Sequence, residues 1–278
     1  AELRYEHSDH GSILLGPGGA SCSLRGPGAG GAAAWELELQ AQGGRRPWRP
    51  EGWLGRLWRA RLLPCRYLVH TLATPARYAL RAPSGLGAAA GALAFEGEGL
   101  LHAETNFGEA FPEGWLYAQG QGPPEGGADG PQLLLTGGRF RIGPVAPVTW
   151  LLCLRLPGLP PLDFRTTDLD RVLLRRLSFA SGEVALEASR PRWRGGSRSP
   201  RVSLRLRAPP SSFDREGLFV PTVEGFQRSP GAAESFAAVA EVRVSGLPGG
   251  KEAEFSFAGC LLEFGGTFQG PAWAVDRG

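Results

Sequence analysis

The stretch RVSLRLR at 201–207 places three apolar side chains between four polar ones. Successive side chains of a strand point to opposite faces of a sheet, so this alternation predicts a half-buried β-strand. WELELQ at 35–40 and EVALE at 183–187 repeat the pattern. About a dozen short strands can be recognised in this way, which predicts an all-β protein.

Short segments rich in Gly and Pro separate these strands, such as GPGG at 16–19, GPP at 122–124 and LPGG at 247–250. Connections of this length suit antiparallel neighbours and are too short for crossover helices. We therefore expect antiparallel barrel or sandwich lobes, and the two-faced strands fit lipocalin-like barrels that keep an apolar lumen for a ligand. Composition alone does not separate a barrel from a sandwich.

The Pro-rich segment at 156–162 predicts a boundary between two lobes. We expect a first lipocalin-like lobe over residues 1–156 and a second over residues 157–278.

The charges are nearly balanced, with 30 basic and 27 acidic residues and a formal net charge of +3. Nucleic-acid binding uses a concentrated positive field, so no nucleic-acid partner is predicted. The segment 190–200, rich in Arg, Gly and Ser, predicts an exposed hairpin loop, with a nucleotide-binding arm as the alternative.

The cysteines stand alone at wide intervals, without a CxxC pair, and predict buried free thiols instead of a zinc or redox site: they are Cys22, Cys65, Cys153 and Cys260. Asp168 and Asp170 have metal-ligand spacing but no third ligand nearby, so a solvated turn is expected there. No metal and no cofactor are predicted.

Residues 51–63 show apolar positions at helical spacing with arginines between them. A basic helix that carries Trp53, Leu57 and Trp58 suits peripheral contact with a membrane or a lipid droplet. The alternative is a helix packed as a lid across a barrel mouth. No transmembrane helix is predicted, because the longest apolar run, at 145–156, is too short and is interrupted by Pro147 and Arg155.

The most informative stretch for function is LLHAETNFGEAFPEGWLYAQG at 100–120. Period two puts His102, Glu104 and Asn106 on one face of a first strand. It puts the side chains that follow the turn on one face of a second strand: these are Trp115, Tyr117 and Gln119. If both faces line one cavity, an acid, an imidazole, two amides and two aromatic rings surround an apolar space.

This stretch resembles the tocopherol cyclases, whose corresponding segment reads approximately EKNWG, three variable residues, FP, two variable residues and WFWxQ. The identities are Glu104, Asn106, Gly108, Phe111, Pro112, Trp115 and Gln119, while Phe107 and Tyr117 replace Trp. Weaker similarity continues in VALEASRP at 184–191, LRAP at 206–209, PTVEG at 221–225 and LEFGG at 262–266, so that it spans roughly residues 35–268.

The resemblance implies that a prenylated benzoquinol, the hydrophobic small-molecule substrate, closes its phenolic oxygen onto the nearest double bond of its own tail. It implies no redox cofactor and no metal. Two departures bear on it: Thr105 stands where the family has Lys, and the chain is shorter than plant members at its N-terminus, so part of the first lobe is expected to be missing. Plant relatives lie at plastid lipid droplets, but nothing in this sequence shows an address.

From the residues themselves we infer the following roles. A desolvated Glu104 keeps its proton near neutral pH and acts as the general acid. Trp115, Tyr117 and Phe107 face the developing cation, and Phe111 adds to the apolar wall. Asn106 and Gln119 hold the quinol hydroxyls, and His102 accepts the phenolic proton.

Ordinary structural roles stand beside each of these. Glu104 on a strand is commonly a solvent-facing carboxylate, and His102 a hydrogen-bonded structural residue. Trp115 and Phe111 are core-forming residue types, and Asn106 suits a turn before Gly108. Two rival functions follow: a non-catalytic carrier of lipids or prenylquinones, and a hydratase of isoprenoid double bonds in which water replaces the phenol.

Overall fold

The computed structural model describes residues 3–7, 11–16, 19–27, 33–41, 65–82, 93–108, 111–122, 130–141, 143–191, 199–214, 216–222, 224–229, 231–270 and 275–276. They form antiparallel strands joined by turns, and no α-helix occurs among them, which confirms the all-β prediction. The described residues accordingly include no helix that is long and apolar enough to cross a membrane. The helix expected at 51–63, with Trp53, Leu57 and Trp58, lies outside the described residues.

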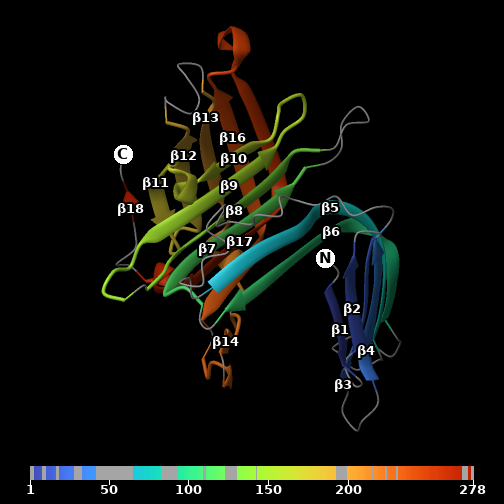
Figure 1. Cartoon of the computed structure of the whole chain (residues 1–278). Coiled ribbons are helices and arrows are strands. Elements are labelled where there is room, and N and C mark those ends of the chain that lie inside the picture. Colours follow the sequence, from blue (N-terminus) through green and yellow to red (C-terminus); the bar gives the residue numbers. More distant parts are fainter. Residues whose placement is uncertain are drawn as a thin grey trace. The chain divides into compact units, whose positions relative to one another are not determined.

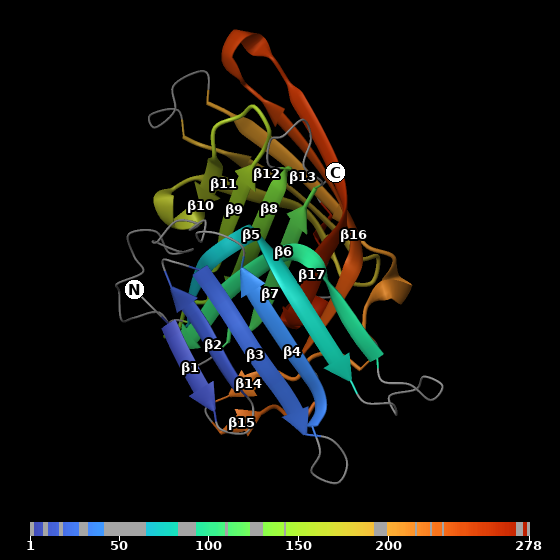
Figure 2. The same cartoon turned by 90° about the vertical axis from the view of Figure 1, so that its right-hand side faces the viewer.

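The chain divides into two compact units. Unit 1 comprises residues 1–50 and 68–105, and unit 2 comprises residues 51–67 and 106–278. Unit 1 is built on a six-stranded sheet in which neighbours in sequence are neighbours in space (Figure 2). Its strands are β1 (Leu3–His7), β2 (Gly11–Gly16), β3 (Gly19–Pro27), β4 (Ala33–Ala41), β5 (Cys65–Ala82) and β6 (Leu93–Gly108), the last two of which continue into unit 2.

The sheet of unit 1 has one apolar and one polar face. The first face carries cross-strand rows such as Cys22–Leu39–Tyr78, and the second carries pairs such as Arg25–Glu36. Most side chains of the apolar face are only half-buried, and Tyr78 keeps 39% of its surface exposed.

Unit 2 holds a nearly closed barrel of nine strands. The sheet runs in the order β10-β9-β8-β7-β17-β16-β13-β12-β11, with β18 (Val275–Asp276) beside β11 (Figure 1). Its strands are β7 (Gly114–Gln121), β8 (Gln132–Arg139), β9 (Val148–Arg155), β10 (Leu162–Arg165), β11 (Arg171–Ser178), β12 (Glu183–Ser189), β13 (Arg201–Arg207), β16 (Ala232–Ser245) and β17 (Ala253–Gly266). A separate hairpin pairs β14 (Pro221–Thr222) with β15 (Gly225–Phe226).

Inward-facing side chains from every barrel strand pack into one hydrophobic core. In β13 these are the three apolar residues of RVSLRLR, which are fully buried while the residues between them are exposed. The core thus follows from the period-two pattern, because alternate positions of each strand reach the interior. Its largest fully buried members are Phe164, Phe264, Phe268 and several leucines.

The predicted lobe boundary at 156–162 falls inside unit 2. It lies in the turn between β9 and β10, which pair with each other in the barrel sheet through Leu154 and Leu162. A Pro-rich segment marks a tight turn as well as a linker, and here it makes the turn. The division of the chain instead passes through β5 and β6.

The connection from β10 to β11 contains a strained leucine. A 3₁₀ turn over Thr166–Asp168 ends at Leu169, whose φ of 64° is left-handed and whose side chain is 70% exposed. A left-handed residue with a Cβ costs about 1–2 kcal/mol, and Asn tolerates this conformation better than Leu does.

Leu169→Asn is therefore expected to raise the free energy of unfolding by about 0.5–1 kcal/mol, since little apolar contact is lost. Urea denaturation measures the change. Leu169→Ala, which removes the same exposed surface without relieving the backbone, should give no gain; an equal gain from both substitutions contradicts the backbone explanation.

Candidate functional site

Trp115, Tyr117 and Gln119 share the face of β7 that points away from the barrel core, since Leu116 and Ala118 between them belong to that core. Tyr117 is nevertheless only 8% exposed. Its hydroxyl donates a hydrogen bond to Gln119 Oε1 at 3.0 Å. Its ring meets that of Tyr67, the last residue of the first segment of unit 2, edge to face at 6.2 Å between centroids.

The turn before β7 folds over the same face. Phe111 lies 5.5 Å from Trp115 between ring centroids. Pro112 lies against Gly138 of β8, where an added Cβ would come within 3.0 Å of the proline ring. Phe111 and Pro112 therefore cover one end of the outward face of β7. Gly138 has no side chain, and this leaves room for Pro112.

Glu263 of β17 places a carboxylate beside these rings. It is the direct cross-strand neighbour of Tyr117, and it accepts a hydrogen bond from Trp115 Nε1. The next residue on this face, Gly265, lies opposite Trp115, and a Cβ there would overlap the indole ring. Only glycine lets Trp115 lie across β17 and reach Glu263.

A second carboxylate follows on the neighbouring strand. Glu234 of β16 is the direct cross-strand partner of Glu263. Direct partners in an antiparallel sheet have Cβ atoms about 4.5–5.5 Å apart, so the two side chains share one face at short range. Burial raises the pKa of the Glu234 carboxyl, and the negative charge of Asp214 raises it further. Glu234 thus retains a proton more readily than an ordinary glutamate does.

This shift has a consequence for stability. Because the pKa of Glu234 is higher in the folded protein than in the unfolded chain, the folded state binds more protons between the two values. Stability therefore falls as pH rises through that window.

Glu234→Gln has no carboxyl group to ionise at this position. We therefore expect the difference in free energy of unfolding, variant minus wild type, to increase from pH 4 to pH 7. Urea denaturation across this range tests it. A difference between the two proteins that stays constant with pH contradicts the raised pKa.

An apolar strip adjoins the rings on the same face of the barrel. Tyr117 is paired across the strands with Thr136, which is paired with Leu151, and the next row joins Leu134 to Cys153. All four of these neighbours are buried. The outward face of β16, β17, β7, β8 and β9 therefore runs from two carboxylates through aromatic rings to an apolar region that is shielded from water.

The predicted residues of unit 1 form a separate pair. His102 Nε2 lies 2.7 Å from Glu104 Oε2 on β6, and the side chains are 13% and 27% exposed, respectively. Thr105, which stands where a lysine was expected, is hydrogen-bonded to His70 Nε2 at 2.6 Å. The imidazole and the carboxylate are thus brought together as predicted, but they belong to unit 1, whereas the rings belong to unit 2.

The remaining predicted residues are less informative. Asn106, next in unit 2, is exposed, and the side chain of Phe107 lies outside the described residues. Among the described cysteines, Cys153 and Cys260 are buried, and burial raises the pKa of the Cys260 thiol to about 11; Cys22 is half-buried. Asp170 accepts a hydrogen bond from the Arg165 backbone amide, so it serves the turn. No group of three or more metal-ligating side chains occurs among the residues described.

Glu263 and Glu234 are the site residues that the sequence analysis missed. Glu263 lies in LEFGG, a segment that the resemblance included, but its pairing with Trp115 bridges 148 positions of the chain. A glycine pair after an acidic residue signals a close approach by another segment, although it does not name that segment.

Comparisons of this chain with models of protein families, with curated proteins and with solved structures find no match. The chemistry of the site therefore has to be argued from its own residues. Two adjacent carboxyl groups, one of them with a raised pKa, can give and take a proton, and the aromatic rings beside them can stabilise a nearby positive charge.

Proposed function

We propose that the chain is a tocopherol cyclase-like enzyme that closes the chroman ring of a prenylated benzoquinol by adding a proton to the prenyl double bond. The observation that carries the proposal is the arrangement on one face of unit 2, where Glu263 and its neighbour Glu234 stand beside Trp115 and Tyr117. The reaction needs an acid and rings on the same face, because the cation develops at the carbon next to the one that is protonated.

The carboxyl pair can donate one proton and accept another, so that it is unchanged at the end of the reaction. A protonated carboxyl gives its proton to one alkene carbon, and the other alkene carbon becomes a tertiary cation. The phenolic oxygen bonds to that cation and loses its proton to the ionised carboxylate of the pair. The pair thus ends with the same number of protons, and transfer between Glu234 and Glu263 restores the starting state. The reaction is an isomerisation and requires no oxidant.

The aromatic rings and the exclusion of water would stabilise the tertiary cation. The faces of Trp115 and Tyr117 attract a positive charge by about 0.5–2 kcal/mol each. Such an effect cannot drive the reaction alone, and exclusion of water prevents the cation from being trapped as an alcohol. Gln119, which is half-buried on the same face, suits a quinol hydroxyl.

Glu104 and His102 form a second candidate acid–base pair for the same reaction. Their hydrogen bond of 2.7 Å would let the imidazole accept the phenolic proton and return it to the carboxyl group. The two side chains are only partly exposed, at 13% and 27%, respectively.

The test is to incubate the protein with a phytylated benzoquinol in detergent micelles under anaerobic, reducing conditions. The expected result is a chromanol of unchanged mass, detected by chromatography and mass spectrometry. Absence of the chromanol, with the protein shown to be folded, contradicts the proposal, and an alcohol heavier by one water would instead identify a hydratase.

A non-catalytic carrier of lipids is the second candidate function. It is favoured by the apolar face of the unit 1 sheet, whose side chains are only half-buried. Binding of the quinol at full occupancy without conversion would select this function.

A further inference from the structure

The outward face of β11, β12, β13 and β16 carries an uncompensated row of arginines. Arg171, Ser189, Arg201 and Ser245 are direct cross-strand neighbours and so form one row across four strands. The row holds two positive charges and no carboxylate. Neighbouring strands are about 4.8 Å apart, so the two arginines, which are two strands apart, start about 10 Å from each other.

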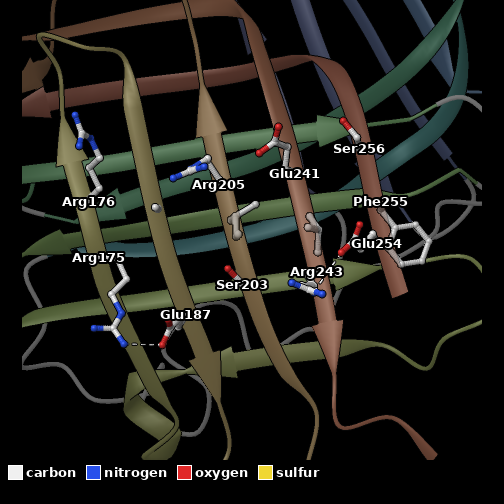
Figure 3. A pocket seen from close by; sticks show the side chains of 13 residues that line it. Arg175, Arg176, Glu187, Ser203, Arg205, Glu241, Arg243, Glu254, Phe255 and Ser256 are labelled. Carbon is white, nitrogen blue, oxygen red and sulfur yellow. Dashed lines mark hydrogen bonds and ion pairs between the residues drawn. The ribbon is translucent and has the colours of Figure 1, made fainter. Parts of the chain in front are cut away.

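The adjacent rows of this face differ, because their charges are paired (Figure 3). Arg175 pairs with Glu187 at 2.9 Å, and Arg205 pairs with Glu183 at 3.5 Å. Arg243 pairs with two glutamates of the 252–254 segment at 2.9 and 3.2 Å. Among the described residues, by contrast, neither Arg171 nor Arg201 has an ion-pair partner.

The row lines an open groove of about 980 Å³. Among the described residues, the lining includes four arginines and one carboxylate, that of Glu187, which is already paired with Arg175. Four serines contribute hydroxyl groups, and the hydroxyl of Ser199 is buried without a hydrogen-bond partner in the described part of the chain. At the groove margin Arg190 is held in place, with its guanidinium 5.8 Å from the Phe164 ring centroid and Nη2 3.4 Å from the Asp163 carbonyl oxygen.

We propose that this groove binds a phosphate monoester group through Arg171 and Arg201. Guanidinium groups match the geometry of phosphate oxygens and form paired, charge-assisted hydrogen bonds with them. Serine hydroxyls add neutral donors between the two arginines. The groove is large enough for a phosphorylated small molecule or a lipid headgroup. The site is independent of the proposed cyclisation, because none of its lining residues belongs to the carboxyl pair or to the aromatic rings and binding needs no reaction.

The experiment compares two double variants with the wild-type chain. Arg171→Gln/Arg201→Gln removes the uncompensated row. Arg175→Gln/Arg205→Gln removes two arginines of the same face that already have carboxylate partners, so the net charge changes by the same amount. Circular dichroism and thermal unfolding confirm that each variant is folded.

Two probes distinguish the source of the phosphate. Glycerol 3-phosphate, followed by calorimetry, tests a soluble ligand, and phosphatidylcholine vesicles with and without phosphatidic acid, followed by sedimentation, test a lipid headgroup. For whichever probe binds, we expect the Arg171/Arg201 variant to weaken binding about tenfold or more, since it loses the charge-assisted hydrogen bonds to the phosphate. The Arg175/Arg205 control should stay within about twofold of the wild type.

Binding of either probe with this difference between the variants supports the proposal and identifies the source. The proposal is overturned if neither probe binds, if binding survives the loss of Arg171 and Arg201, or if the control variant loses binding equally. In the last case, general attraction by the net charge explains the result.

Discussion

Glu263→Gln is expected to lower the rate of chromanol formation by about 10²–10⁴-fold, the range that a general acid or base contributes. Gln keeps the size of the side chain but can neither give nor take the proton, while its amide oxygen still accepts the Trp115 N–H. Substrate binding should change little, because the aromatic rings remain in place. Single-turnover measurements with saturating quinol separate the chemical step from binding.

Two matched variants sharpen this result. Glu254→Gln, on the same strand, removes an exposed carboxylate paired with Arg243 and should leave the rate within about twofold of the wild type. Glu104→Gln tests the acid–base pair of unit 1. If Glu104→Gln abolishes the reaction and Glu263→Gln does not, the proton comes from unit 1. Full activity in both variants contradicts a role in proton transfer for both Glu263 and Glu104.

Phe264→Ala is expected to lower the free energy of unfolding by about 3–5 kcal/mol. The ring is fully buried in the barrel core and meets Phe179 at 5.6 Å and Phe213 at 5.8 Å between centroids. Truncation removes those contacts and leaves a cavity that the rigid strands around it cannot close. Urea denaturation of the full chain measures the change in the free energy of unfolding.

Phe226→Ala is the control for this substitution, since its ring is 72% exposed on the β14–β15 hairpin. It should change stability by less than about 0.5 kcal/mol. A loss below about 1 kcal/mol for Phe264→Ala would mean that the core repacks around the missing ring, and it would contradict the close packing described for the barrel.

Period two in the sequence was sufficient to predict the strands that bury one face. The alternations at 35–40, 183–187 and 201–207 all fall within strands of the structure. Burial of one face of a sheet makes apolar and polar residues alternate within each strand, and this local pattern can be recognised in the sequence. No local sequence pattern predicted where the chain divides into units. It passes through the interior of β5 and β6, whereas the Pro-rich segment at 156–162 makes a turn within the barrel.

The candidate site was predicted only in part, for a similar reason. The side chains of β7 and the His102–Glu104 pair lie within short stretches, where strand periodicity indicates which residues share a face. The Glu234–Glu263 pair depends instead on the register of β16 against β17, and its place beside Tyr117 depends on the register of β17 against β7. Register between distant strands is set by packing and turn geometry, which a single sequence does not display.

The seam of the barrel lies between β10 and β11, which are consecutive in the chain. Only Thr166–Asp170 joins them, and the Asp170 amide donates to the Arg165 carbonyl across the connection. A connection of only five residues therefore spans the gap between these two strands, which are not paired with each other in the barrel sheet. A short loop loses little entropy when its ends are brought together. The covalent connection therefore keeps β10 and β11 close to each other, as strand pairing does for the other neighbouring strands. A cut in this loop would leave the packing of core side chains such as Phe164 and Leu177 to hold the two strands together.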